Sequence, residues 1–356
     1  NEAYKLFPRR LGMAHDRRGQ KSPAPVSGSK GGLLVRSLLS LKMVLILLIV
    51  AVAQSYGSGP TTDDSVASLL RNARASIDLG YSIHPRGIMI DFGAKGDGLG
   101  GLIGVRHEYP VEGLWLTRNS ELTITDSLAI RYSGSWLIPF SGQSSEYYDF
   151  GGVNAGSVES RTWTSNLQWW TIDGAALLSA CGPATFLAGL RYDSLQSGFK
   201  NPGPFDGFLA GLGRTSFRAD EADLDLYTWI PYGGAEMGLG PVTVGVLAAP
   251  TVFGNIKYGE TFGYINRRMK HTGSLDRGYF FEGFARFSTE VGWGSAALVG
   301  AFAKYSYLHG TGTVDATTMD FAGASDFTND TFDLSVRTQN WVIGATLRVE
   351  LAGLLW

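Results

Sequence analysis

Cysteine and charged residues are both scarce in this chain of 356 residues. Cysteine occurs once, at Cys181, so the chain cannot form an intramolecular disulfide, and no set of cysteines and histidines has the spacing of metal ligands. Charged residues make up 17% of the chain, whereas a soluble globular domain averages about 25%. The net charge of −2 gives no support for a nucleic-acid partner.

Long hydrophobic runs are also missing. The continuous apolar run Met43–Ala53 has about 11 residues, and a membrane-spanning helix needs roughly 20. This run follows the basic residues Arg36 and Lys42 and ends in small residues, which is the organisation of a secretory signal peptide. We therefore expect a signal peptide over residues 35–53, cleaved after Ala53. An uncleaved membrane anchor is the alternative.

Residues 1–34 differ in composition from everything that follows them. They are basic and rich in Gly, Ser and Pro, and the chain starts at Asn1 rather than at methionine. We interpret them as a non-native or disordered basic leader; a nucleic-acid-binding or lipid-binding arm is the less favoured alternative. Residues 54–75 are expected to form a short periplasmic lead-in to a domain over residues 76–356.

What this domain does contain is alternation of apolar and polar residues. One example is the segment 128–140, in which Arg131 and Ser133 are among the polar residues and have odd numbers. Its large apolar residues all have even numbers: Leu128, Ile130, Tyr132, Trp136, Ile138 and Phe140. Successive residues of a strand point to opposite faces, so each such segment has one apolar face. Behind a signal peptide, this pattern predicts strands with one face toward lipid and the other toward a polar lumen.

The connections between these segments alternate in length. Short connections lie near residues 125–127, 179–183, 240–241 and 292–294. Long ones, expected to be solvated loops, lie near residues 141–161, 201–221, 254–277 and 310–332. Short periplasmic turns that alternate with long external loops are the layout of a transmembrane barrel. We therefore predict an all-β fold, an antiparallel, up-and-down transmembrane β-barrel.

About ten strands are expected in this barrel, with twelve or eight as alternatives. They span residues 100–109, 113–124, 128–140, 163–179, 184–198, 222–239, 242–254, 278–292, 295–309 and 334–351. Residues 76–83 and 87–94 also alternate, and they form either two further strands or one strand kinked around Pro85. Aromatic residues near strand ends, among them Trp169, Trp170, Trp229 and Tyr232, are interpreted as interfacial girdles.

With this pattern the chain resembles the outer-membrane β-barrel proteins of Gram-negative bacteria over about residues 76–356, and its size is similar to that of the omptin group. The resemblance implies residence in the cell outer membrane, contact with outer-membrane lipid and lipopolysaccharide, and insertion by the barrel-insertion machinery. It implies no cofactor, metal or nucleic acid, and it leaves the oligomeric state open. The terminal Trp356 departs from the family, because its parity is opposite to that of the apolar residues Leu347, Val349 and Leu351.

Charged residues on the polar faces are expected to line the lumen. A barrel of eight to ten strands leaves little open space inside, and buried charges must be paired, so a salt-bridged plug is the favoured interpretation. A narrow pore or solute-binding channel lined by the same groups is the alternative. The residues concerned are Arg131, Asp173, Arg191, Asp193, Glu236, Glu282, Arg286, Glu290, Lys304, Arg348 and Glu350.

Catalytic candidates are weak. Omptin proteases use an aspartate pair that faces an Asp–His pair at the extracellular rim, and this sequence has no Asp-x-His pair in a matching place. Asp223 and Asp225 share one strand face near a rim and are the only weak candidates. The sequence therefore favours a structural or narrow-channel barrel without catalytic activity. An outer-membrane hydrolase (omptin-like protease or lipid-modifying barrel) and a surface adhesion or recognition barrel remain the alternatives.

Overall fold

The structure is a computed structural model that describes residues 73–94, 102–140, 142–151, 155–164, 166–179, 182–200, 204–211, 213–217, 219, 221–262, 267–290, 297–320 and 330–350. These residues all belong to one compact unit of the chain. The expected leader, the signal peptide and Trp356 lie outside the described residues. Within the described part, no helix has the length and apolarity that crossing a membrane requires.

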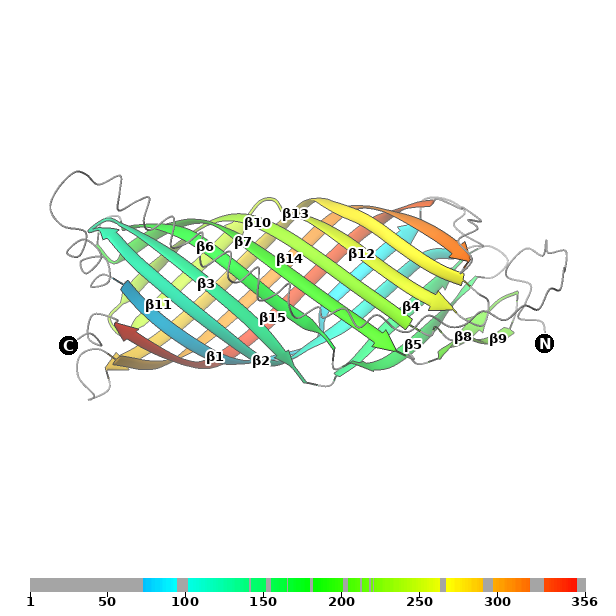
Figure 1. Cartoon of the computed structure of the whole chain (residues 1–356), viewed down its shortest axis with the longest axis horizontal. Coiled ribbons are helices and arrows are strands. Elements are labelled where there is room, and N and C mark those ends of the chain that lie inside the picture. The colour runs from blue at the N-terminus through cyan, green and yellow to red at the C-terminus, as the bar shows by residue number, and fades with distance from the viewer. Residues whose placement is uncertain are drawn as a thin grey trace, which may run out of the picture. The chain divides into compact units, whose positions relative to one another are not determined.

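One antiparallel sheet of 15 strands contains all the regular structure described, and it closes on itself (Figure 1). Closure is made by β1, which pairs with β2 on one side and with β15 on the other. The strands are β1 (Ala73–Ala94), β2 (Leu102–Thr125), β3 (Leu128–Pro139), β4 (Gly142–Phe150), β5 (Gly156–Thr164), β6 (Gln168–Ser179), β7 (Ala184–Lys200), β8 (Phe205–Leu209), β9 (Gly213–Phe217), β10 (Glu221–Leu239), β11 (Val242–Ala249), β12 (Phe253–Phe262), β13 (Arg267–Glu290), β14 (Ala297–Asp320) and β15 (Asp330–Glu350).

Several of these strands continue one another along the barrel wall. β3 and β4 both pair with β2, and β11 and β12 both pair with β10 and with β13. Counted this way, the ring has about 10 strands in an up-and-down order, which confirms the predicted fold class and strand number.

Of the two alternatives for residues 76–94, the single strand kinked around Pro85 is confirmed, whereas the strand boundary predicted between residues 109 and 113 is wrong. Residues 76–83 and 87–94 form the single strand β1, whose pairing register shifts between Ser82 and Ile88. The two segments predicted at 100–109 and 113–124 form the single strand β2. Pro110 lies opposite the shifted part of β1 that contains Pro85, so two residues without an N–H share one interruption of the ladder. Each proline therefore bends a strand without ending it.

The segments predicted as long solvated loops are also largely strand. β4 and part of β5 occupy residues 141–161, β12 and the first part of β13 occupy 254–277, and β14 and β15 extend into 310–332. Their composition is polar because the polar residues face outward there. The apolar residues between them, such as Tyr148, Ile256 and Val314, are buried inside the barrel.

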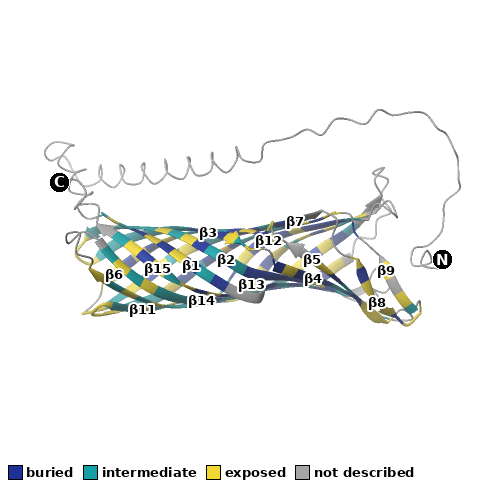
Figure 2. Ribbon diagram, turned by 90° about the horizontal axis from the view of Figure 1, so that it is seen from below, coloured by how far each residue is buried: buried dark blue, intermediate teal, exposed yellow. Residues whose placement is uncertain are grey.

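The barrel has two halves with opposite distributions of apolar side chains. Figure 2 marks along each strand which residues are buried and which are exposed. On β1, Ile77 and Leu79 are about half exposed on the outer face, whereas Ile88 and Ile90 are completely buried. We call the part next to the short turns, from Ala73 to Ser82 on β1 and from Tyr279 to Glu290 on β13, the membrane half. The remainder is called the outer half.

An apolar band covers the outside of the membrane half. It runs from Trp229 to Leu239 on β10 and from Tyr279 to Phe287 on β13, with exposed apolar residues on alternate positions. These spans of about 9–11 residues match the length that a tilted strand needs to cross the hydrocarbon layer. Trp170 and Trp229 lie in contact with Tyr192 on the outer face, as expected for a girdle. Trp169 and Tyr232, in contrast, are buried inside the barrel, so the girdle interpretation was wrong for these two residues.

Candidate functional site in the barrel interior

The membrane half encloses a polar cavity of about 470 Å³. Inward-facing residues of strands all around the ring line it, and they include most of the charged residues that the sequence assigned to the lumen. Those in the lining are Arg131, Asp173, Arg191, Glu236, Glu282, Arg286, Lys304 and Arg348. Asp193 is buried beside them and is joined to Arg191. Glu290 is exposed at the end of β13, and the side chain of Glu350 is not among those described.

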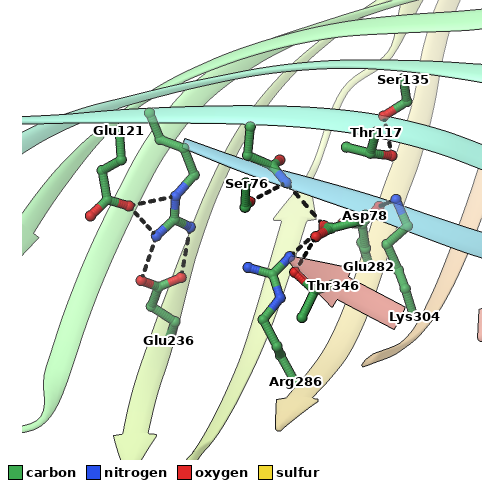
Figure 3. Close-up of polar contacts among 12 residues, drawn as sticks. Ser76, Asp78, Thr117, Glu121, Ser135, Glu236, Glu282, Arg286, Lys304 and Thr346 are labelled. Atoms are coloured by element: carbon green, nitrogen blue, oxygen red, sulfur yellow. Dashed lines mark hydrogen bonds and ion pairs between the residues drawn. The ribbon is translucent and has the colours of Figure 1, made fainter. Parts of the chain in front are cut away.

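Arg131 is held between two carboxylates. Its guanidinium group donates to Glu121 at 2.9 and 3.0 Å, and to both oxygens of Glu236 at 2.8 Å. Figure 3 shows Glu121 and Glu236 on either side of this one guanidinium group. Glu121 lies on β2 and Glu236 on β10, which do not pair with each other, so the contact crosses the lumen. Paired, charge-assisted bonds of this geometry are among the strong hydrogen bonds of proteins.

Two further charge clusters complete the network. Arg191 pairs with Asp193 and with Glu282, each at 2.9 Å, and the ammonium of Lys304 lies 3.8 Å from Glu282. Beside them, Asp173 accepts a hydrogen bond from the hydroxyl of Tyr232. The clusters join strands β6, β7, β10, β13 and β14 across the interior. The pairing avoids isolated buried charges, each of which would be strongly unfavourable in a site of this depth.

Asp78 is the centre of the other cluster, which Figure 3 shows near Arg286 and Thr346. Its carboxylate accepts from Arg286 at 2.7 Å, from the hydroxyl of Thr346, and from the amide of Asn119 at 2.9 Å. With three donors on a nearly buried carboxylate, the acceptor capacity of Asp78 is largely used.

Apolar side chains fill the lumen beyond this network. Trp115 and Trp169 meet edge to face, with ring centroids 5.3 Å apart, and Phe280 lies under the guanidinium group of Arg191 at 5.2 Å. Farther into the outer half, the inward residues of every long strand are buried and mostly apolar. They include Ile88, Ile90, Phe92, Val105, Val111, Leu224, Leu226, Ile230, Ile256, Leu275, Leu308, Val314, Phe332, Leu334 and Val336.

A small polar cluster is embedded in this apolar interior, and the sequence reasoning missed it. The Nδ1 atom of His107 lies 3.2 Å from Glu146, and the hydroxyl of Tyr258 donates to the same carboxylate oxygen at 3.3 Å. The ring of Tyr258 contacts His107 at 4.2 Å between centroids and stacks on His271 at 5.8 Å. Glu260 is also buried here. Four strands, β2, β4, β12 and β13, contribute to the cluster.

The outer-half cluster is not fully satisfied by the protein. Neither oxygen of Glu260 has a hydrogen-bond partner, nor does Nε2 of His107 or Nδ1 of His271. Burial, together with the charge of Glu146, raises the pKa of Glu260 well above its ordinary value. Burial, assisted by His107, lowers the pKa of His271 to about 3. Among the residues described, no group of three or more histidine, cysteine or acidic side chains could hold a metal ion.

No spacing in the sequence could reveal this cluster. His107 and His271 have no acid near them in the sequence at a spacing that predicts contact, and their partners come from other strands. Only the closure of the barrel and the registers of β2 with β4 and of β12 with β13 place them together. His309, on β14, contacts Ser335 at 3.3 Å and lies apart from the cluster.

Asp223 and Asp225 lie on the outside of the barrel wall. They share one face of β10 as predicted, but it is the outer face, because Leu224 between them is buried in the interior. Asp223 is exposed, with Arg268 at 4.0 Å, and Asp225 accepts a hydrogen bond from Gln196 at 2.9 Å. The structure therefore brings neither carboxylate into the lumen; Asp223 lies opposite Gly259, on the outer side of the wall from Tyr258 and Glu260.

No family model matches the sequence, and no curated protein matches it. Among solved structures, the outer membrane protease OmpT from Escherichia coli is similar with a TM-score of 0.60 and 12% identity, over 78% of this chain and 96% of that one. Two further solved structures also match. The translocator domain of the autotransporter NalP from Neisseria meningitidis has a TM-score of 0.35 and 8% identity, over 88% of this chain and 97% of that one. The outer membrane protein OprG from Pseudomonas aeruginosa has a TM-score of 0.34 and 9% identity, over 78% of this chain and 95% of that one. At such identity the likeness to OmpT shows the fold, that of an outer-membrane β-barrel.

Proposed function

We propose that this protein is a closed barrel of the outer membrane, of structural rather than channel type, whose outer half is a rigid body at the cell surface. The observation that carries the proposal is the exchange of faces halfway along the barrel. Where the outer surface stops being apolar, the inner surface becomes apolar, and its side chains fill the interior. Packing of this kind among the described residues would leave no continuous aqueous path for ions through the outer half.

The same surfaces support the partners and the location that we propose. The apolar band on the membrane half fits outer-membrane lipid, and the polar outer half would extend into lipopolysaccharide. Insertion by the barrel-insertion machinery and export by a signal peptide cleaved after Ala53 are part of this proposal. The lumen charges have a structural role in it, since each of the clusters around Arg131, Arg191 and Asp78 joins strands from different parts of the ring.

Single-channel recording on the refolded full chain in a planar bilayer tests closure. We expect no stable conductance from the wild-type protein. A variant with Trp115→Gly and Trp169→Gly removes the two indole rings that meet beside the charge network, and it should also stay closed, because the apolar filling of the outer half lies beyond them. Folding of each sample is checked by circular dichroism. Steady, voltage-independent conductance of the folded wild-type protein would refute the proposal.

A recognition role at the surface is the second candidate, and the β8–β9 hairpin favours it. This hairpin pairs with β5 and carries Phe208, an aromatic side chain that is 64% exposed in a half whose outer face is otherwise polar. Binding of the purified protein to a panel of envelope glycans and surface proteins would test this role. Binding that is unchanged when residues 205–217 are replaced by a short Gly/Ser turn would rule out the hairpin.

A further inference from the structure

Arg348 lines the lumen cavity and, among the residues described, has no ion-pair partner. It lies on β15, faces inward, and is flanked by Ser76 of β1 and Leu298 of β14 in the sheet register. Among the residues described, it forms no hydrogen bond or ion pair, whereas Arg131, Arg191 and Arg286 each have a carboxylate partner. Its guanidinium group therefore keeps its donors available to the cavity.

The neighbouring carboxylates are already engaged. Asp78 accepts three hydrogen bonds, and Glu121 and Glu236 share Arg131 between them. Arg286, Arg74 and Arg131 are among the charged groups with the largest influence on Arg348, together with the acid Glu121. The three arginines repel Arg348, and an anion bound beside it would offset this repulsion.

A second unsatisfied donor lies in the same lining. The Nε atom of Arg286 is buried and has no partner, although another nitrogen of the same group holds Asp78. Buried donors in native proteins are almost always satisfied by protein, water or a bound ion. The cavity of about 470 Å³ is large enough for a small solute with its water, since a water molecule takes about 30 Å³ of liquid.

The position of the cavity allows a solute to enter. Its lining includes Thr125, Asp126 and Ser179, which lie at the turn end of the barrel. That end faces the periplasm in the proposed orientation, and the apolar filling of the outer half lies at the other end. The cavity is therefore reached from the side on which soluble metabolites and headgroups are present, and not through the outer half.

We infer that this cavity is a binding site for a phosphate-class oxyanion, held by Arg348 with Arg286 beside it. Guanidinium groups donate in a fixed fork that matches phosphate and carboxylate oxygens, and such charge-assisted bonds are strong. An oxyanion would accept from the unpaired guanidinium group of Arg348 and offset the repulsion among the arginines. The inference does not depend on whether the barrel is closed, because an open lumen would present the same groups.

Titration of inorganic phosphate into the refolded full chain in phosphate-free detergent buffer, followed by calorimetry and by ³¹P line width, tests this site. We expect saturable binding to the wild-type protein. Arg348→Gln should weaken it by about tenfold or more, the loss of about 1.4 kcal/mol or above, and Arg348→Lys should retain part of it. Arg277→Gln is the matched control, since Arg277 is exposed in the outer half, and its binding should equal that of the wild type.

The source of the anion is distinguished by repeating the titration in nanodiscs. Equal affinity in phosphate-free maltoside micelles and in phosphatidylglycerol discs assigns the site to a free oxyanion, and weaker phosphate binding in the discs assigns it to a lipid headgroup phosphate. No saturable binding to the folded wild-type protein overturns the inference. So does an Arg348→Gln variant that is folded and binds phosphate as the wild type does.

Discussion

His271 should make the outer half sensitive to acid, and replacing it with phenylalanine should remove that sensitivity. Its ring lies among those of Phe92, Tyr258 and Phe332, at centroid distances of 5.0, 5.8 and 6.0 Å, so a phenyl ring suits the site. Burial lowers its pKa from 6.5 to about 3. At about 1.4 kcal/mol per unit of pKa, protonating this imidazole in the folded state is disfavoured by about 5 kcal/mol.

The sign follows from linkage. Because the folded-state pKa of His271 is depressed, its contribution to stability is fully present above pH 6.5 and is lost as the pH falls toward 3. Between pH 6.5 and pH 4 the wild-type protein should lose about 3 kcal/mol from this residue. Glu146, Glu260, His107 and Tyr258 also face the site, so the informative quantity is the difference between wild type and His271→Phe.

Native-state hydrogen exchange of the β12 and β13 amides at pH 7 and pH 4, corrected for intrinsic rates, measures this difference in the full chain. The wild type should lose protection at pH 4 that His271→Phe retains. His309→Phe is the control, because His309 lies outside the cluster and is only partly buried, and it should behave as the wild type. Equal loss of protection in the wild type and in His271→Phe would refute the reasoning.

Three further outcomes are expected. Arg131→Met should destabilise the barrel by about 3–5 kcal/mol in urea unfolding from lipid vesicles, because Glu121 and Glu236 lose their shared partner. Adding Glu121→Gln and Glu236→Gln should recover most of this loss of stability. Absence of any recovery would contradict a plug of paired charges. Ile343→Arg, at the most exposed apolar position of the band, should lower the free energy of unfolding by about 2–4 kcal/mol in the same assay. Thr331→Arg, on the outer half of the same strand, should change it very little. Equal losses in the two variants would show that the band is misplaced. Glu260→Gln should be more stable than wild type above neutral pH, because burial raises the pKa of Glu260 and its contribution is lost as the pH rises through that value; a urea midpoint that falls with pH equally in both proteins would contradict this.

The arrangement of the membrane half was predictable because the outer face of each strand meets lipid and the inner face meets a charged lumen. Ile77 and Leu79 alternate with Asp78, and both lipid outside and a charged lumen inside favour that assignment. In the outer half the same alternation fits two arrangements, because the polar residues can face either the lumen or the outside of the barrel. Asp223 and Asp225 alternate with Leu224 as lumen charges would, yet there the leucine faces inward. Alternation predicts a strand in either case, but it does not specify which face meets water.

Register breaks and closure account for the remaining differences. On β13 the odd-numbered residues Leu275, Tyr279 and Phe281 look continuous in the sequence. A register shift between Leu275 and Arg277 places Leu275 inside and Tyr279 outside. The outer-half cluster depends on contacts between strands that are far apart in the chain, such as His107 with Tyr258, and these exist only after the ring has closed.

The abrupt exchange of faces fixes how high the barrel stands in the bilayer. On β10 the outer face changes from Asp225 to Trp229 within four residues, and on β13 from Asp276 to Tyr279 within three. A shift of one residue pair along the tilted strand, about 5 Å along the membrane normal, would place acids in hydrocarbon or rings in water. About ten residues of β13 precede this line, so with a tilt of about 40° the strand tips are held about 25 Å above the lipid surface. Any partner that binds at the tips would therefore meet them at a constant distance from the bilayer.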